Sequence, residues 1–99
     1  MNPKERYINK SYNFISLGRL VEQKNYSFLI EVIKNIPKEF DYKVYIAGNG
    51  PLYNHLKEMI KRYNLTNRVF LLGYVDNVYR ILNKSQCFIL PSILEFFFQ

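Results

Sequence analysis

The feature that most constrains the fold is an alternation of short β-rich runs with segments of helical periodicity. The β-rich runs cover residues 12–17, 42–47, 69–72 and 87–90. Between them, apolar residues recur at helical spacing within residues 28–36, 52–63 and 78–82. Because each helical crossover returns the chain to the same edge of the sheet, this order predicts parallel strands.

The predicted order β-α-β-α-β-α-β is a partial Rossmann-like parallel sheet of the α/β class. With right-handed crossovers and the strand order 3-2-1-4, the first and fourth strands are neighbours. Ligands of such sheets bind at this switch point, outside the carboxyl ends of the strands. The candidate site is therefore expected at Gly18–Arg19 and at Pro91–Ser92 through Glu95.

Length and composition indicate one small globular domain. The chain has 99 residues, of which 48% are hydrophobic and 22% charged. Residues 1–11 are predicted to form a polar linker or tail, and residues 12–99 the partial domain. The single cysteine, Cys87, excludes an internal disulfide. No apolar run approaches the ~20 residues of a transmembrane helix, so we expect a cytoplasmic protein, with peripheral membrane association as an alternative.

The charge balance favours anionic partners. Lys and Arg total 14 against 8 acidic residues, which gives a net charge of +6. The basic residues are scattered, and groups such as Lys57, Lys61 and Arg62 are expected on solvated faces. Because no nucleic-acid recognition motif accompanies them, nucleic-acid binding ranks last and no nucleic-acid partner is expected.

Two candidate phosphate-contacting segments follow strands. Gly18 and Arg19 end the first strand, and Lys24 lies just beyond. Glycine permits close approach of a ligand, and the two cations suit a diphosphate. An ordinary turn with two solvated cations explains these residues equally well. After the second strand, Gly48-Asn49-Gly50-Pro51 opens a helix, and a tight turn is favoured there over phosphate binding.

Other chemistries find little support in the sequence. Tyr53 occupies the third glycine position of the dinucleotide-binding fingerprint, which disfavours a nicotinamide dehydrogenase. His55 is the only histidine and is expected at the surface. Zinc-ligand spacing, a P-loop and a nucleophile elbow are all missing from the sequence.

Taken together, these segments resemble the donor-binding C-terminal domain of the GT-B-type retaining glycosyltransferases of group 1. The resemblance covers roughly residues 12–95 through the following motifs: Phe14-Ile15-Ser16-Leu17-Gly18-Arg19-Leu20 with Glu22-Gln23-Lys24-Asn25, Ile46-Ala47-Gly48-Asn49-Gly50-Pro51-Leu52, Val69-Phe70-Leu71-Leu72-Gly73-Tyr74-Val75, and Phe88-Ile89-Leu90-Pro91-Ser92 with Glu95. The motifs occur in the family's order and spacing.

The resemblance implies roles for individual residues. Arg19 and Lys24 would bind the diphosphate of a nucleotide-sugar donor, beside Gly18 and the turn containing Gly48 and Gly50. Gly73, Tyr74 and Val75 would lie against the base, and Glu95 would contact the donor sugar. The family uses no metal ion, so no cofactor is expected. The family's second motif glutamate would lie beyond Gln99, and Phe96–Phe98 occupy places that are usually Gly-Phe-Gly.

The resemblance predicts a truncated donor-binding fragment of a glycosyltransferase, inactive alone and weak in donor binding. The alternative is a non-catalytic interaction module, or half of a split enzyme that pairs with a partner chain. Both predictions leave the outer edge of the fourth strand open beside Phe96–Phe98, where a missing half or a second copy would associate.

Overall fold

The computed structural model describes residues 11–77, 87–90 and 95–98, the last two segments by their backbone alone. Its elements in chain order are β1 (Ser11–Leu17), the 3₁₀-helix η1 (Glu22–Lys24), α2 (Tyr26–Ile33), β2 (Asp41–Ala47), α3 (Tyr53–Arg62), β3 (Val69–Gly73), β4 (Cys87–Leu90) and β5 (Glu95–Phe98). The helix predicted within residues 78–82 lies outside the described residues.

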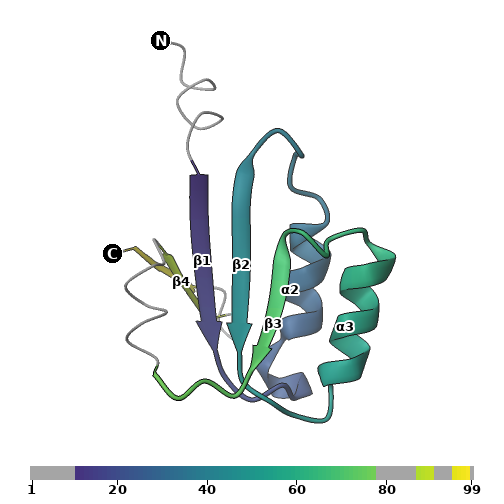
Figure 1. Cartoon of the computed structure of the whole chain (residues 1–99), viewed down its shortest axis with the longest axis vertical. Helices are drawn as coiled ribbons and strands as arrows, with labels where there is room; N and C mark the ends of the chain where they lie inside the picture. The colour runs from purple at the N-terminus through teal and green to yellow at the C-terminus, as the bar shows by residue number, and fades with distance from the viewer. Residues whose placement is uncertain (1–10, 78–86, 91–94, 99) are drawn as a thin grey trace.

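The sheet confirms the predicted parallel topology. Its strand order is β3-β2-β1-β4-β5. β1 pairs in parallel with β2, with Phe14 opposite Val44, and β2 pairs in parallel with β3. β1 also pairs in parallel with β4, with Phe14 opposite Cys87. The carboxyl ends of β1, β2 and β3 therefore gather at one edge of the sheet (Figure 1).

The prediction that the fourth strand has an open outer edge is wrong. β5 pairs antiparallel with β4, so that Phe96, Phe97 and Phe98 lie opposite Ile89, Phe88 and Cys87. Phenylalanine favours extended backbone, and pairing with β5 satisfies N–H and C=O groups of β4 that were expected to be unpaired. The three phenylalanines are thus part of the sheet, and its outer edge moves to β5.

The core lies between the sheet and the two helices α2 and α3, which cover the same face (Figure 1). β2 alternates as predicted, with Tyr42, Val44 and Ile46 buried. On α3, the buried residues are Leu56, Met59 and Ile60. This cluster fixes both helices on the sheet and so fixes the loops that lead into them.

The apolar face of α2 differs from the predicted one. The helix buries Tyr26, Leu29, Ile30 and Ile33. Phe28 and Val32 are 44% and 45% exposed, although their spacing placed them in the predicted stripe. The inward face is therefore shifted towards Tyr26 and Ile30, because packing on the sheet decides which apolar face of α2 is buried.

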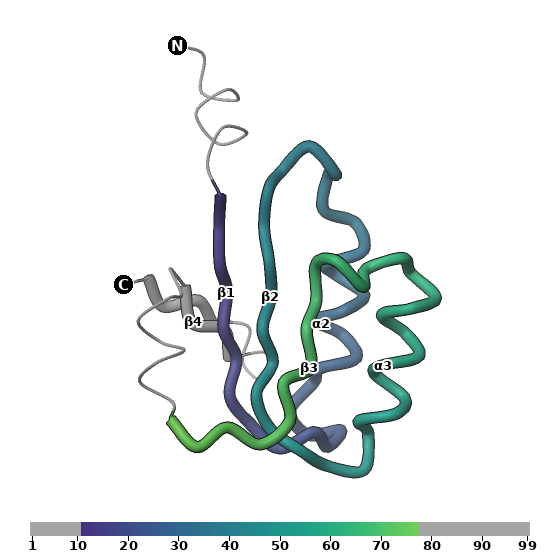
Figure 2. Tube along the Cα trace, viewed as in Figure 1, coloured from purple at the N-terminus to yellow at the C-terminus, as the bar shows by residue number. Residues whose placement is uncertain are grey.

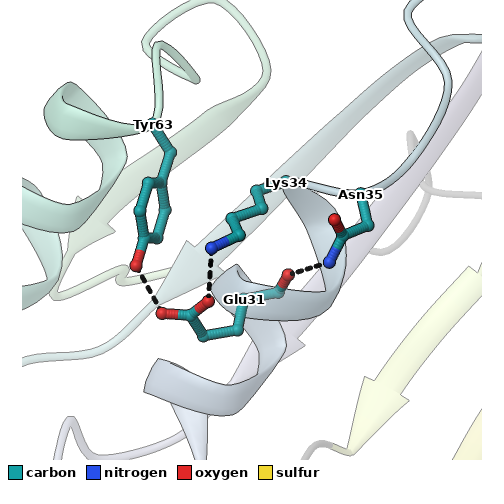
Figure 3. Close-up of polar contacts among 4 residues, drawn as sticks. All are labelled: Glu31, Lys34, Asn35 and Tyr63. Atoms are coloured by element: carbon teal, nitrogen blue, oxygen red, sulfur yellow. Dashed lines mark hydrogen bonds and ion pairs between the residues drawn. The ribbon is translucent and has the colours of Figure 1, made fainter.

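Two polar clusters lie at the other end of the molecule, where β2 and β3 begin and α2 and α3 end. The Arg68 guanidinium donates to the carbonyls of Phe40 at 2.7 Å, Lys38 at 3.0 Å and Tyr42 at 3.3 Å. Across the helices, the Tyr63 hydroxyl donates to the Glu31 carboxylate, which also pairs with Lys34 at 3.0 Å (Figure 3). These contacts tie the β2 start to β3 and the end of α2 to α3.

Candidate functional site

Three loops meet at the carboxyl edge of the sheet and are joined by backbone hydrogen bonds (Figure 2). The Gly18 N–H donates to the Ala47 carbonyl at 3.1 Å, and the Leu20 N–H to the Asn49 carbonyl at 3.0 Å. The Gly48 N–H donates to the Gly73 carbonyl at 2.7 Å. We call the segments 18–20, 47–50 and 73 the loop cluster. These hydrogen bonds fix the backbones of the three loops relative to one another without a ligand.

Close approach of the backbones explains the glycines after β2. Gly48 has φ +144°, and a Cβ placed on it would lie 1.9 Å from the Gly18 carbonyl oxygen. A Cβ on Gly50 would lie 2.5 Å from the Leu20 carbonyl oxygen. The chain turns here as predicted, but the glycines are needed because a side chain at either position would collide with the backbone of the first loop. Sequence spacing gave no indication of that partner.

A buried pair of hydroxyls lies beneath the first loop. The Ser16 and Tyr26 oxygens are 2.9 Å apart, and the residues are 0% and 1% exposed. Burial raises the pKa of Tyr26, and the hydrogen bond with Ser16 opposes that rise in part. The Tyr26 hydroxyl therefore keeps its proton to a higher pH than an exposed tyrosine does. No role in the site was predicted for either residue. Tyr26 was missed because the expected helical stripe began two residues after it.

The two predicted diphosphate ligands flank this buried pair. Arg19 is exposed and directly follows Gly18, while Lys24 is exposed at the end of η1. The Lys24 Cδ lies 3.9 Å from the position that a Cβ on Gly18 would take. Asn25, with φ 63°, turns the chain from η1 into α2. The structure thus places Lys24 beside the first loop, as the predicted site requires.

The remaining predicted site residues lie at or near the same edge. Gly73 ends β3 with φ +71°, and Tyr74 beside it is 78% exposed. Val75 is partly buried. Glu95 begins β5 opposite Leu90, and its side chain lies outside the described residues, as do Pro91 and Ser92. The geometry assembles Gly18, Gly48, Gly50 and Gly73, with Arg19 and Lys24 at their side.

Other features of the described residues lie apart from this cluster. A cavity of about 390 Å³ between α3 and β3 is lined by none of the predicted site residues. His55 is exposed on α3, as predicted. Over residues 11–77 and the two backbone segments, no group of three potential metal ligands occurs. The helices in these ranges are too short or too polar to cross a membrane.

Comparison with known proteins identifies the family of this chain. The profile of the family described as "Glycosyl transferases group 1" matches residues 2–97. The chain belongs to this family. It is 42% identical over 86 residues to an uncharacterized glycosyltransferase of Methanocaldococcus jannaschii, which covers 86% of this chain and 21% of that protein.

A second relative carries a more specific name. The chain is 36% identical over 83 residues to the N-acetylgalactosamine-N,N'-diacetylbacillosaminyl-diphospho-undecaprenol 4-alpha-N-acetylgalactosaminyltransferase of Campylobacter jejuni. That match covers 84% of this chain and 22% of the enzyme. The group 1 chain thus spans about a fifth of the length of the curated relatives it matches.

Solved structures confirm the fold. A mutant of TarM from S. aureus, crystallised with fondaparinux, alpha-GlcNAc-glycerol and UDP, superposes with a TM-score of 0.74 at 26% identity. The superposition covers 82% of this chain and 17% of TarM. The group 1 family and its fold are therefore established for this chain.

Proposed function

We propose that this group 1 chain supplies the diphosphate-binding part of a nucleotide-sugar site in a glycosyltransferase, which moves a sugar from the nucleotide to an acceptor. One observation carries the proposal: exposed Arg19 belongs to the glycine-lined loop cluster at the carboxyl end of β1, and Lys24 lies beside that cluster, next to Gly18. A nucleoside diphosphate has a planar base and an anionic diphosphate, and cations beside a closely approaching glycine backbone suit the anionic part. The UDP in the TarM crystal supports uridine diphosphate as the probe.

The base and the sugar of the donor are assigned to residues at the same edge of the sheet. We place the nucleotide base against Gly73, Tyr74 and Val75, since Tyr74 presents an exposed ring beside the end of β3. We assign the donor sugar to Glu95. Retention of the anomeric configuration and independence from metal ions rest on the family resemblance and stay predictions. A non-catalytic interaction module is not favoured by the family match.

The chain on its own is expected to bind donor weakly and to transfer no sugar. Transfer requires donor and acceptor to be held together in near-attack geometry, and the described residues provide one wall of such a site. Nucleoside diphosphate binding is expected to be no tighter than roughly millimolar.

Calorimetric titration with UDP tests the proposal. A charge-assisted hydrogen bond contributes about 1.5–3 kcal/mol, so Arg19→Ala and Lys24→Ala are each expected to weaken UDP binding by roughly tenfold or more. The matched control is Lys61→Ala, because Lys61 is an exposed cation in the last turn of α3. Unchanged binding in Arg19→Ala would refute the assignment. Equal weakening by Lys61→Ala would show that general positive charge attracts the nucleotide.

A further inference from the structure

Packing of the core alone does not call for the buried Ser16–Tyr26 hydroxyl pair, because apolar residues of nearly the same shape exist. Ser16 is 0% exposed and is the buried polar residue among the described side chains. An isolated buried hydroxyl is costly, but replacing both partners of a hydrogen bond by apolar groups of similar shape is close to neutral. Alanine and phenylalanine at these two positions would keep the same carbon skeleton without the two oxygens. The presence of the pair therefore points to a local role.

The position of the pair indicates what that role is. A Cβ on Gly18 would lie 3.0 Å from the Tyr26 hydroxyl oxygen, so this oxygen fills the space that Gly18 leaves empty. Tyr26 is also the first residue of α2, one residue beyond Asn25 and two beyond Lys24. One fixed side chain thus touches the loop that carries Arg19 and belongs to the segment that carries Lys24.

We propose that Tyr26, oriented by Ser16, is a positioning residue that sets the spacing between Arg19 and Lys24 for a bound diphosphate. The inference rests on the proposed function. Two cations held at a fixed spacing lose less conformational freedom when they bind an anion, which is how a fixed scaffold raises affinity. Ser16 acts by fixing the direction of the Tyr26 hydroxyl, and neither residue contacts the ligand.

Amide hydrogen exchange tests whether the pair holds the loop. The probes are the Gly18 and Leu20 N–H groups, which donate to Ala47 and Asn49. Loss of one hydrogen bond is expected to make their exchange about two- to tenfold faster in Tyr26→Phe and in Ser16→Ala. The matched control is Tyr42→Phe, because Tyr42 is 5% exposed and lies near the other end of β2.

UDP titration tests whether the held loop serves binding. Tyr26→Phe is expected to weaken UDP binding about two- to tenfold, and Tyr42→Phe to leave it unchanged. The penalty of Arg19→Ala is expected to be smaller in the Tyr26→Phe background, because Arg19 is then no longer held at its spacing from Lys24. A purely structural role would leave that penalty the same. All titrations are done well below the unfolding temperature of the least stable variant.

The outcomes separate this inference from the proposed function. Equal exchange rates in Tyr26→Phe and Tyr42→Phe would overturn the loop-holding role. Faster exchange with unchanged UDP affinity would overturn the role in binding, while Arg19→Ala in the wild-type background tests the diphosphate site independently. A wild-type chain without UDP binding would refute the proposed function and the binding role together, and the exchange rates would still decide whether the pair holds the loop.

Discussion

Replacing Gly48 with alanine is expected to separate the first two loops of the site. The residue has φ +144°, and its new Cβ would lie 1.9 Å from the Gly18 carbonyl oxygen and 2.9 Å from the Gly18 carbonyl carbon. Both atoms belong to the backbone, so no side-chain rotation relieves the contact. Unfavourable backbone conformation costs about 1–3 kcal/mol, and forced repacking costs about 1–3 kcal/mol more. Gly48→Ala is therefore expected to lose roughly 2–6 kcal/mol of unfolding free energy.

Gly73→Ala is the matched control for this substitution. Gly73 also has a positive φ, +71°, but the nearest atom to its added Cβ is the Asn49 Oδ1 at 3.7 Å. Only the left-handed conformation opposes alanine there, at about 1–2 kcal/mol. Gly73→Asn is expected to lose less than Gly73→Ala, because asparagine tolerates this conformation.

Urea unfolding followed by circular dichroism measures the three variants. For a chain of this size, 1 kcal/mol corresponds to about 4–8 °C in Tm. Gly48→Ala is expected to unfold at a much lower urea concentration than Gly73→Ala. If Gly48→Ala is already unfolded at 25 °C without urea while Gly73→Ala is folded, that result also agrees with the reasoning. Equal stability of Gly48→Ala and Gly73→Ala would refute the close approach of the two loops.

Three further predictions concern stability. Gly18→Ala is expected to destabilise the chain less in the Tyr26→Phe background, because the oxygen 3.0 Å from the added Cβ is then absent; additive losses in urea would contradict this contact. Arg68→Met is expected to cost about 2–3 kcal/mol by freeing three carbonyls, with UDP affinity unchanged in calorimetry. Tyr63 and Lys34 lower the pKa of Glu31 below its ordinary 4.5, so its stabilising effect is present above that pH and lost as pH falls through the lowered value. The difference in urea midpoint between wild type and Glu31→Gln is expected to shrink on acidification, and a constant difference would contradict the role of the carboxylate.

Strand positions and their parallel order were predictable because they depend on local patterns. β4 was predicted at its observed bounds, Cys87–Leu90, and β2 within one residue, because β-rich runs that end at glycine or proline mark strands directly. The candidate cations Arg19 and Lys24 were found in the same way, since each follows a strand end. The inward face of α2 was harder to predict. Phe28 and Val32 have helical spacing but lie 44% and 45% exposed, because packing on the sheet decides which of two apolar faces turns inward.

The sequence by itself determined an α/β chain with two cations, Arg19 and Lys24, after its first strand. Alternation of strand and helix patterns and the residue types after strand ends are local properties. Contacts between different elements were decided only in the tertiary structure. Gly48 packs on Gly18, Tyr26 reaches Ser16 beneath the first loop, and Phe96–Phe98 pair with β4. The contact of Gly48 with Gly18 depends on the register of β1 and β2, and register is set by packing of the whole sheet rather than by local pattern. The other two contacts depend on how α2 and β5 pack against the rest of the sheet.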